Sequence, residues 1–169
     1  SEIPTTPEQD LISYKAWTSP NVTIDKATII RCASFRNGIR TSNVYTKSFF
    51  IDDKMFEKYT LPIISLITAT ENLFSYDSGI YVPGVHFNQN DPEWTGNYFQ
   101  KGEGWERPVH VEYFETNGSL GFSQNAGIRI HGLKTRQAAQ KSLRLYAREE
   151  YEEKYFNYQL MPQKSKLLN

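Results

Sequence analysis

Two Asn-Gly pairs, at positions 37–38 and 117–118, each lie between runs in which apolar and polar residues alternate. Alternation with a period of two is typical of β-strands, because successive side chains of a strand point to opposite faces. Both residues of an Asn-Gly pair tolerate the positive φ that a tight hairpin turn needs. The sequence therefore predicts strands near 27–35 and 43–51 around the first pair, and a second hairpin over 107–132.

Shorter elements are expected between and after these hairpins. The apolar run "LPIISLIT" (61–68) predicts a buried strand, and Thr70 is a candidate N-cap for a one-turn helix. "GIYV" (79–82) predicts a short strand, and 85–106 is loop-like. The other expected elements are a short helix or linker at 52–59, a short helix at 134–139 and a strand at 141–147. Together they predict an α+β, β-rich fold with antiparallel hairpins, a mixed sheet and a few short helices.

The composition excludes several classes of protein. The chain carries 19 basic and 19 acidic residues, which argues against a dedicated nucleic-acid binder. Its longest apolar stretches, about six residues, are too short to span a membrane. Cys32 is the one cysteine, so there is no internal disulfide framework. The chain does not begin with Met or a signal-peptide pattern, and it ends in "KSKLLN"; we expect residue 169 to be a boundary within a longer protein.

Familiar enzyme motifs are missing from the 169 residues. The sequence contains no G-x-x-x-x-G-K-[ST], H-E-x-x-H, G-x-S-x-G or C-x-x-C motif. "KGEGWE" (101–106) has the first two glycines of a phosphate loop without the third. His110 and His131 could face each other across the second hairpin, either as part of a metal site or, more typically, as ordinary sheet histidines.

The strongest candidate for chemistry is the basic stretch from Gly127 to Tyr151. Arg129 and His131 share one face of a strand, and Lys141 begins the next strand. If these strands lie side by side, the three side chains could converge on a phosphate, with Arg as a bidentate clamp and Lys as a point charge. The same charges also fit the polar face of a half-exposed sheet, which is the more usual pattern.

Several separated stretches resemble one family, in the order in which that family carries them. These are "LPIISLIT…ENLFSYDSGIYVPG", "NYFQKGEGWERPVHVEYFE", "FSQNAGIRIHG" and "QKSLRLYAREEY…FNY". Over about residues 59–160 the chain is similar to the CotH family of spore-coat-type, atypical kinase-like proteins. "TIIRCASFRNGIRTSNVYTKSFFI" resembles the last strands of a chitobiase-C-terminal, fibronectin-like β module. We therefore expect an arm and partial β-sandwich strands in 1–54, and the N-terminal part of a CotH-like domain in 55–169.

The resemblance implies an ATP- and Mg²⁺-dependent kinase that phosphorylates Ser of a coat or surface protein, in a spore coat or a secreted, cell-surface system. Lys141 matches the family's phosphate-contacting lysine, and Arg129 and His131 match its R-x-H-G strand. The chain departs from the family at Leu133, where Gly is common, and at Ala139, where Pro is common. The family's metal-binding and catalytic Asp residues follow the "FNY" motif, beyond residue 169. This chain alone is therefore expected to hold no catalytic residue or metal, to bind nucleotide weakly, to be inactive and to be able to dimerise through its cut edge.

The alternative is a non-catalytic cell-surface scaffold that binds a partner or a carbohydrate through exposed aromatic side chains. Trp17, Trp94 and Trp105 are the candidates for such contacts. Burial in a core is the more usual role of each, because large aromatic side chains mostly serve packing.

Overall fold

The computed structural model describes residues 24–52, 54 and 60–160. Within these residues thirteen elements follow one another, and every described strand pair is antiparallel. The predicted α+β, β-rich class is confirmed, although the main sheet is antiparallel throughout its described strands rather than mixed. The predicted helix or linker at 52–59 lies largely outside the described residues.

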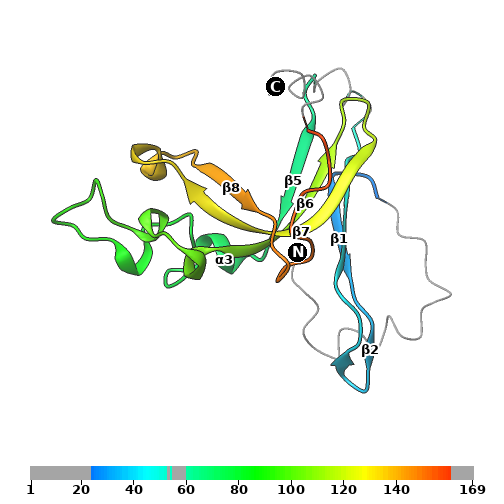
Figure 1. The fold of residues 1–169 in the computed structure, drawn as a ribbon, viewed down its shortest axis with the longest axis horizontal. Helices are drawn as coiled ribbons and strands as arrows, with labels where there is room; N and C mark the ends of the chain where they lie inside the picture. Colours follow the sequence, from blue (N-terminus) through cyan, green and yellow to red (C-terminus); the bar gives the residue numbers. More distant parts are fainter. Residues whose placement is uncertain (1–23, 53, 55–59, 161–169) are drawn as a thin grey trace.

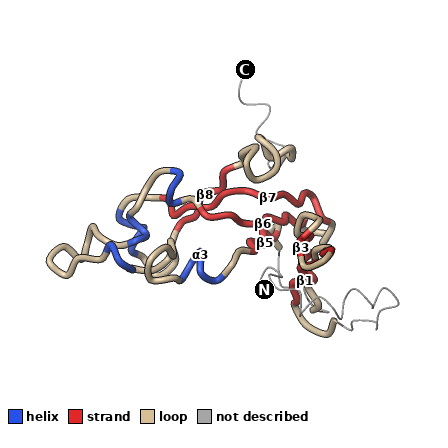
Figure 2. The backbone as a smooth tube through the Cα atoms, turned by 90° about the horizontal axis from the view of Figure 1, so that it is seen from below, coloured by secondary structure: helices blue, strands red, loops and turns tan. Residues whose placement is uncertain are grey.

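A four-stranded sheet forms the centre of the molecule (Figure 1). Its order is β5-β6-β7-β8, so each strand pairs with its neighbours along the chain. The long strand β7 curves strongly, and the sheet curls with it (Figures 1 and 2). The strands are β5 (Ile63–Ile67), β6 (Arg107–Phe114), β7 (Leu120–His131) and β8 (Ser142–Tyr146).

The first predicted hairpin is a separate ribbon that lies against this sheet. Strands β1 (Thr28–Cys32) and β4 (Tyr45–Phe49) pair along their length, and the short strands β2 (Phe35–Arg36) and β3 (Ile39–Arg40) close its tip. Asn37 and Gly38 both have positive φ, as a tight two-residue turn requires. We call the β1–β4 hairpin the ribbon.

The second predicted hairpin is the β6–β7 pair, and its turn differs from the first. Of the two central residues only Gly118 has positive φ, and its N–H donates to the Glu115 carbonyl at 2.8 Å. Asn117 accepts hydrogen bonds from the Ser119 N–H and hydroxyl instead. The register shifts at Tyr113/Phe114 accommodate this longer turn.

The two faces of the sheet have different roles. The core face carries Val109, Val111, Ala126, Ile128 and Ile130, which form the buried cluster together with side chains of the long β5–β6 connection. The opposite face, which we call the ribbon face, meets the ribbon. There the Ser48 N–H donates to the fully buried Glu112 carboxylate at 2.7 Å, and the Ser48 and Ser65 hydroxyls lie 2.8 Å apart.

Three predictions for residues 61–82 are wrong in detail. β5 is an edge strand with Ile64 half exposed, because it pairs with β6 alone. The helix α3 (Thr70–Phe74) is capped at Ala69, one residue before the predicted position. Residues 79–82 form a turn rather than a strand, since the Ile80 N–H donates to the Asn72 carbonyl of α3.

The predicted loop at 85–106 and the predicted helix and strand at 134–147 are confirmed. Three single-turn 3₁₀ helices lie within or at the start of the loop, and a fourth forms the short helix expected before β8. They are η1 (Gly84–His86), η2 (Asn97–Phe99), η3 (Glu103–Trp105) and η4 (Lys134–Gln137).

Candidate functional site

Lys141 lies where two connections meet at one end of the sheet. It directly precedes β8, and its Nζ is 4.4 Å from the ring centroid of Tyr98 and 5.2 Å from that of Tyr81, both in the β5–β6 connection. Its Nζ also donates to the Ala138 carbonyl at 2.8 Å. The Tyr81 hydroxyl accepts the Lys141 backbone N–H at 2.9 Å and donates to the Ala139 carbonyl at 3.3 Å. Two tyrosine rings and two backbone groups therefore set the position of this ammonium group.

The ammonium group of Lys141 is held in place without a carboxylate partner among the described residues. No carboxylate forms an ion pair with its Nζ within the described part of the chain. Partial burial lowers the pKa of Lys141 below its usual value. Contact with aromatic faces stabilises a cation by about 0.5–2 kcal/mol while leaving its charge available. The arrangement suits an incoming anion, because such a ligand meets a cation that no protein carboxylate has neutralised.

Arg136 supports this site, and the sequence analysis assigned it no role. Its guanidinium is buried and donates to three backbone carbonyls, Gly132 at 2.7 Å, Tyr98 at 2.9 Å and Gln100 at 3.1 Å. Burial, and next the nearby charge of Arg129, lower the pKa of Arg136. It therefore ties η4 to η2 and holds Tyr98 in place beneath Lys141. Nothing in its spacing distinguishes Arg136 from the neighbouring cations.

Arg129 and His131 do not join Lys141. They lie on the ribbon face, whereas Lys141 packs on tyrosines of the core side. Arg129 stacks over Tyr146, with its Cζ 4.1 Å from the ring centroid. The His131 Nε2 lies 3.4 Å from Nη2 of Arg144. The three side chains therefore have different partners, and Arg129 and His131 fit the alternative that the sequence left open, charges on the polar face of a sheet.

The partner of Arg129 is a buried carboxylate, Glu106. Arg148 holds it with two hydrogen bonds, Nε to Oε1 at 2.9 Å and Nη2 to Oε2 at 3.2 Å, and Arg129 Nε lies 3.7 Å from Oε2. Burial, then the charge of Glu106, raise the pKa of Tyr151 to about 12. We call these four residues the Glu106 cluster. It fixes the segment after β8 to the ribbon face, and its charges are already paired.

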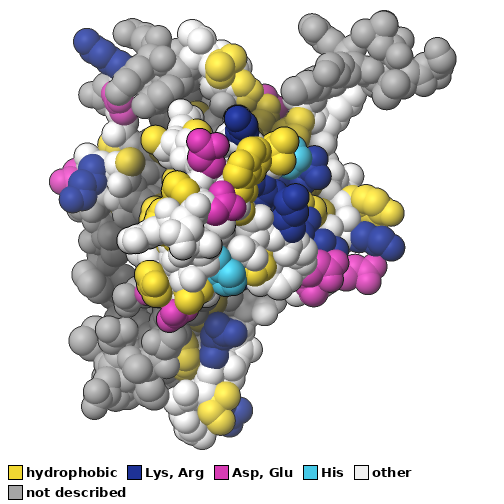
Figure 3. All heavy atoms as spheres, turned by 90° about the vertical axis from the view of Figure 1, so that its left-hand side faces the viewer, with side chains coloured by type: hydrophobic (Ala, Val, Ile, Leu, Met, Phe, Trp, Pro, Cys, Tyr) yellow, Lys and Arg dark blue, Asp and Glu magenta, His cyan; other side chains and the backbone are white. Residues whose placement is uncertain are grey.

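Figure 3 views the molecule from the side of the long β5–β6 connection. Several Lys and Arg side chains gather near the middle of this side, and Asp and Glu side chains lie among and beside them. The positive stretch of the sequence is therefore divided by the fold. Part of it is balanced by carboxylates, as in the Glu106 cluster, and Lys141 is not.

His110 and His131 lie apart, which fits the favoured alternative that both are ordinary sheet histidines. His110 pairs with Asn125 across the hairpin, while His131 lies beyond the end of β6. The His110 Nδ1 is 2.9 Å from Asn125 Oδ1, and its Nε2 is 3.0 Å from the Ser123 hydroxyl. Within residues 24–52 and 60–160 no three His, Cys, Asp or Glu side chains gather as metal ligands would.

The two described candidate tryptophans are differently placed. Trp105 is mostly covered, by the His86 ring at 5.0 Å between centroids and by the Arg107 guanidinium at 5.1 Å. Trp94 is 42% exposed and packs against Phe99, with Lys134 Nζ 5.6 Å from its ring centroid. Trp17 lies outside the described residues. The "KGEGWE" segment forms η3 and its preceding turn.

Comparisons with protein-family models, with curated proteins and with solved structures found no match to this chain. None of the helices in the described ranges is long and apolar enough to cross a membrane. The resemblance to CotH proteins is therefore one of sequence motifs alone, and membership of that family stays a prediction.

Proposed function

We propose that this chain is the nucleotide-binding front part of a CotH-like kinase domain, and that Lys141 contacts the nucleotide phosphates. The observation that carries the proposal is the position of Lys141. Two tyrosine rings hold its ammonium group at the end of the sheet, and no carboxylate of the described residues pairs with it. An ammonium group has three N–H donors, and one of them is used by Ala138.

The residues fit the two cofactors of the proposal unequally. Lys141 suits a phosphate, and Arg136 acts as a positioning residue through Tyr98. Mg²⁺, when bound with ATP, would supply positive charge that offsets the negative charge developing during transfer. The described residues contain no cluster of acidic ligands for it, so the proposal does not place Mg²⁺ on them. In the proposal, the Asp residues for metal binding and catalysis follow the "FNY" motif in a longer protein.

Arg129 and His131 do not belong to this phosphate site. Arg129 is committed to Glu106 and Tyr146, and His131 lies on the ribbon face beside Arg144. A phosphate at Lys141 would therefore be bound without them. The wider proposal, based on the resemblance alone, is a Ser-containing protein substrate and a spore-coat or secreted, cell-surface location.

The decisive experiment is a calorimetric titration of ATP into a longer form of the protein, with and without Mg²⁺. We expect Lys141→Ala to weaken binding about tenfold or more, which corresponds to about 1.4 kcal/mol. Lys154→Ala removes an exposed lysine and is the matched control, with affinity unchanged. Equal affinities of wild type and Lys141→Ala would refute the role of Lys141.

The 169-residue chain provides a second test. We expect it to transfer no phosphate from ATP to a protein Ser. Transfer by this chain would contradict the proposal that the catalytic residues follow it in a longer protein. If the longer form binds no nucleotide at all, the non-catalytic scaffold with exposed aromatics such as Trp94 becomes the better description.

A further inference from the structure

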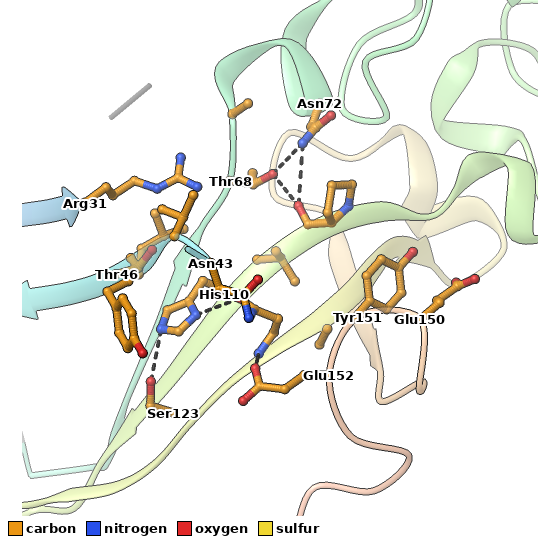
Figure 4. A pocket seen from close by; sticks show the side chains of 18 of the residues that line it. Arg31, Asn43, Thr46, Thr68, Asn72, His110, Ser123, Glu150, Tyr151 and Glu152 are labelled. Atoms are coloured by element: carbon orange, nitrogen blue, oxygen red, sulfur yellow. Dashed lines mark hydrogen bonds between the residues drawn. The ribbon is translucent and has the colours of Figure 1, made fainter. Parts of the chain in front are cut away.

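A cavity of about 750 Å³ lies between the ribbon and the ribbon face of the sheet (Figure 4). Its floor includes His110, Ser123 and Asn125 of β6 and β7. Asn43 and Tyr45 line it from the ribbon, and the segment 150–152 lines it from the other side. The volume is within the range of roughly 300–1,000 Å³ that is usual for small-molecule sites. Lys141 does not line this cavity, so its contents are separate from the proposed nucleotide site.

The floor of the cavity is polar and fixed. His110 uses both ring nitrogens within the protein, one with Asn125 Oδ1 and the other with the Ser123 hydroxyl. Figure 4 shows this ring in the middle of the cavity, with Ser123 below it and Glu152 beside it. These two hydrogen bonds hold the imidazole ring of His110 in one orientation. The floor therefore offers a ligand a fixed polar surface.

Several polar groups around the floor keep hydrogen-bonding capacity. Glu152 accepts the Asn125 backbone N–H at 2.7 Å through Oε2. Asn72 donates to the Thr68 hydroxyl at 2.7 Å through Nδ2. Four polar groups form no hydrogen bond with another described residue. They are Glu152 Oε1, Asn72 Oδ1, Asn125 Nδ2 and the side-chain amide of Asn43. Donors and acceptors are interspersed, and a hydroxyl group can satisfy both kinds because it donates and accepts at once.

The charges on the walls favour a ligand without net charge. Arg31 and Arg40 line the cavity from the ribbon, and Glu150 and Glu152 line it from the segment after β8. Arg31 and Glu150 lie on opposite sides in Figure 4. An anionic ligand would meet the two carboxylates, and a cationic ligand the two guanidinium groups. A neutral ligand with many hydroxyl groups avoids both repulsions.

An exposed aromatic ring completes the cavity. Tyr45 lines it and is 72% exposed. The face of such a ring packs well on the C–H face of a sugar, where it buries apolar area without hindering the hydroxyl groups. We propose that this cavity binds a neutral carbohydrate, with Asn43, Asn125 and Glu152 bonding to sugar hydroxyls and Tyr45 packing on a sugar ring.

The test uses the whole chain and a defined set of sugars. NMR titrations would use cellotetraose, chitotetraose, maltotetraose and mannotetraose as neutral probes, together with trigalacturonate as an acidic probe. A printed glycan array would extend the neutral set. We expect at least one neutral oligosaccharide to bind, with shifts at Asn43, Ser123 and Asn125 amides, and trigalacturonate to bind more weakly. Absence of neutral binding on the array and at millimolar sugar, or binding of acidic sugars alone, would overturn the proposal.

Two variants and a matched control locate the binding. Tyr45→Ala is expected to lower the affinity for the bound neutral sugar about tenfold. Tyr155→Ala removes an equally exposed tyrosine, also 72%, that does not line the cavity, and should leave the affinity unchanged. If Tyr45→Ala fails to fold, as judged by circular dichroism, Asn43→Ala takes its place with the same expected loss. Wild-type affinity in a folded Tyr45→Ala or Asn43→Ala protein would show that the sugar binds elsewhere.

Discussion

Gly127 of β7 leaves the space that the Glu106 carboxylate occupies. A Cβ placed at Gly127 would overlap Oε1 of Glu106 and lie only 2.5 Å from its Cδ. A flexible carboxylate could ordinarily swing aside at little cost. Here its side chain is only 1% exposed, and two Arg148 hydrogen bonds hold it. Gly127→Ala should therefore act by breaking the Glu106 cluster rather than by a simple clash.

The size of the effect follows from the burial of the partners. Breaking a buried ion pair costs roughly 3–5 kcal/mol of stability, mainly because one charge stays buried without a partner or water. The Arg148 side chain is 31% exposed and that of Arg129 is 19% exposed, so both can turn partly to water. We therefore expect Gly127→Ala to lower the free energy of unfolding by about 3 kcal/mol, at the low end of this range. For a chain of this size the melting temperature should fall by about 6–12 °C.

Differential scanning calorimetry and urea unfolding would measure the change. Gly104→Ala is the control, because a Cβ there meets no atom within 4 Å, and it should alter stability by less than about 0.5 kcal/mol. In a Glu106→Ala background, Gly127→Ala should also cost little, since the carboxylate is already gone. A Gly127→Ala protein as stable as the Gly104→Ala protein, or additive costs in the double variant, would refute the reasoning.

Three further predictions concern other polar groups of the fold. Glu112→Ala should lower the free energy of unfolding by about 1–3 kcal/mol, because the buried Ser48 N–H loses its acceptor. Glu112→Gln keeps an acceptor oxygen and should lower it less. Equal losses for the two variants in urea titrations would contradict this. A hydrogen bond to Glu115 is the main cause that raises the pKa of Tyr158 from 10.0 to about 12. The bond should therefore stabilise the fold fully below pH 10 and be lost as the pH rises through 12, and Tyr158→Phe should remove this part of the alkaline unfolding curve. Arg136→Met should lower the free energy of unfolding by about 3 kcal/mol or more, because three carbonyls lose their donor. Amide hydrogen exchange should become faster at 97–100 and 132–137. Unchanged exchange there would show that Arg136 does not hold these segments.

The two hairpins were predictable because their signals are local. Alternation and an Asn-Gly pair act within about ten residues, and both hairpins form where they were expected. The edge position of β5 depends on the order of strands in the sheet, which no local pattern contains. Within 79–82, where a strand was predicted, Ile80 is buried and 1% exposed. Hydrogen bonds to α3 nevertheless fold this segment into a turn, and such contacts have no signature in the sequence.

The candidate site was predictable in one respect and not in others. Lys141 was singled out by resemblance, but the tyrosines beside it come from a distant connection that the sequence alone does not bring near. The possible convergence of Lys141 with Arg129 does not agree with the two-residue period of the strand. The alternation that places Leu143 and Leu145 on the core face also places Lys141 with them, opposite Arg129. The cavity beside the ribbon depends on how two hairpins pack against each other. The sequence of either hairpin alone therefore could not predict it.

The sequential order of the sheet has a consequence for how the molecule folds. β6, β7 and β8 pair with their chain neighbours across short connections, and such local contacts favour rapid pairing. β5 must wait for the long connection that carries Tyr81 and Tyr98 to close, which costs more chain entropy. We therefore expect the strands around Lys141 to form early, with the fast-pairing part of the sheet. The segment that carries Tyr81 and Tyr98 should take its final position later, when the long loop closes. Changes in that long connection can retune the site without delaying the formation of the sheet that presents Lys141.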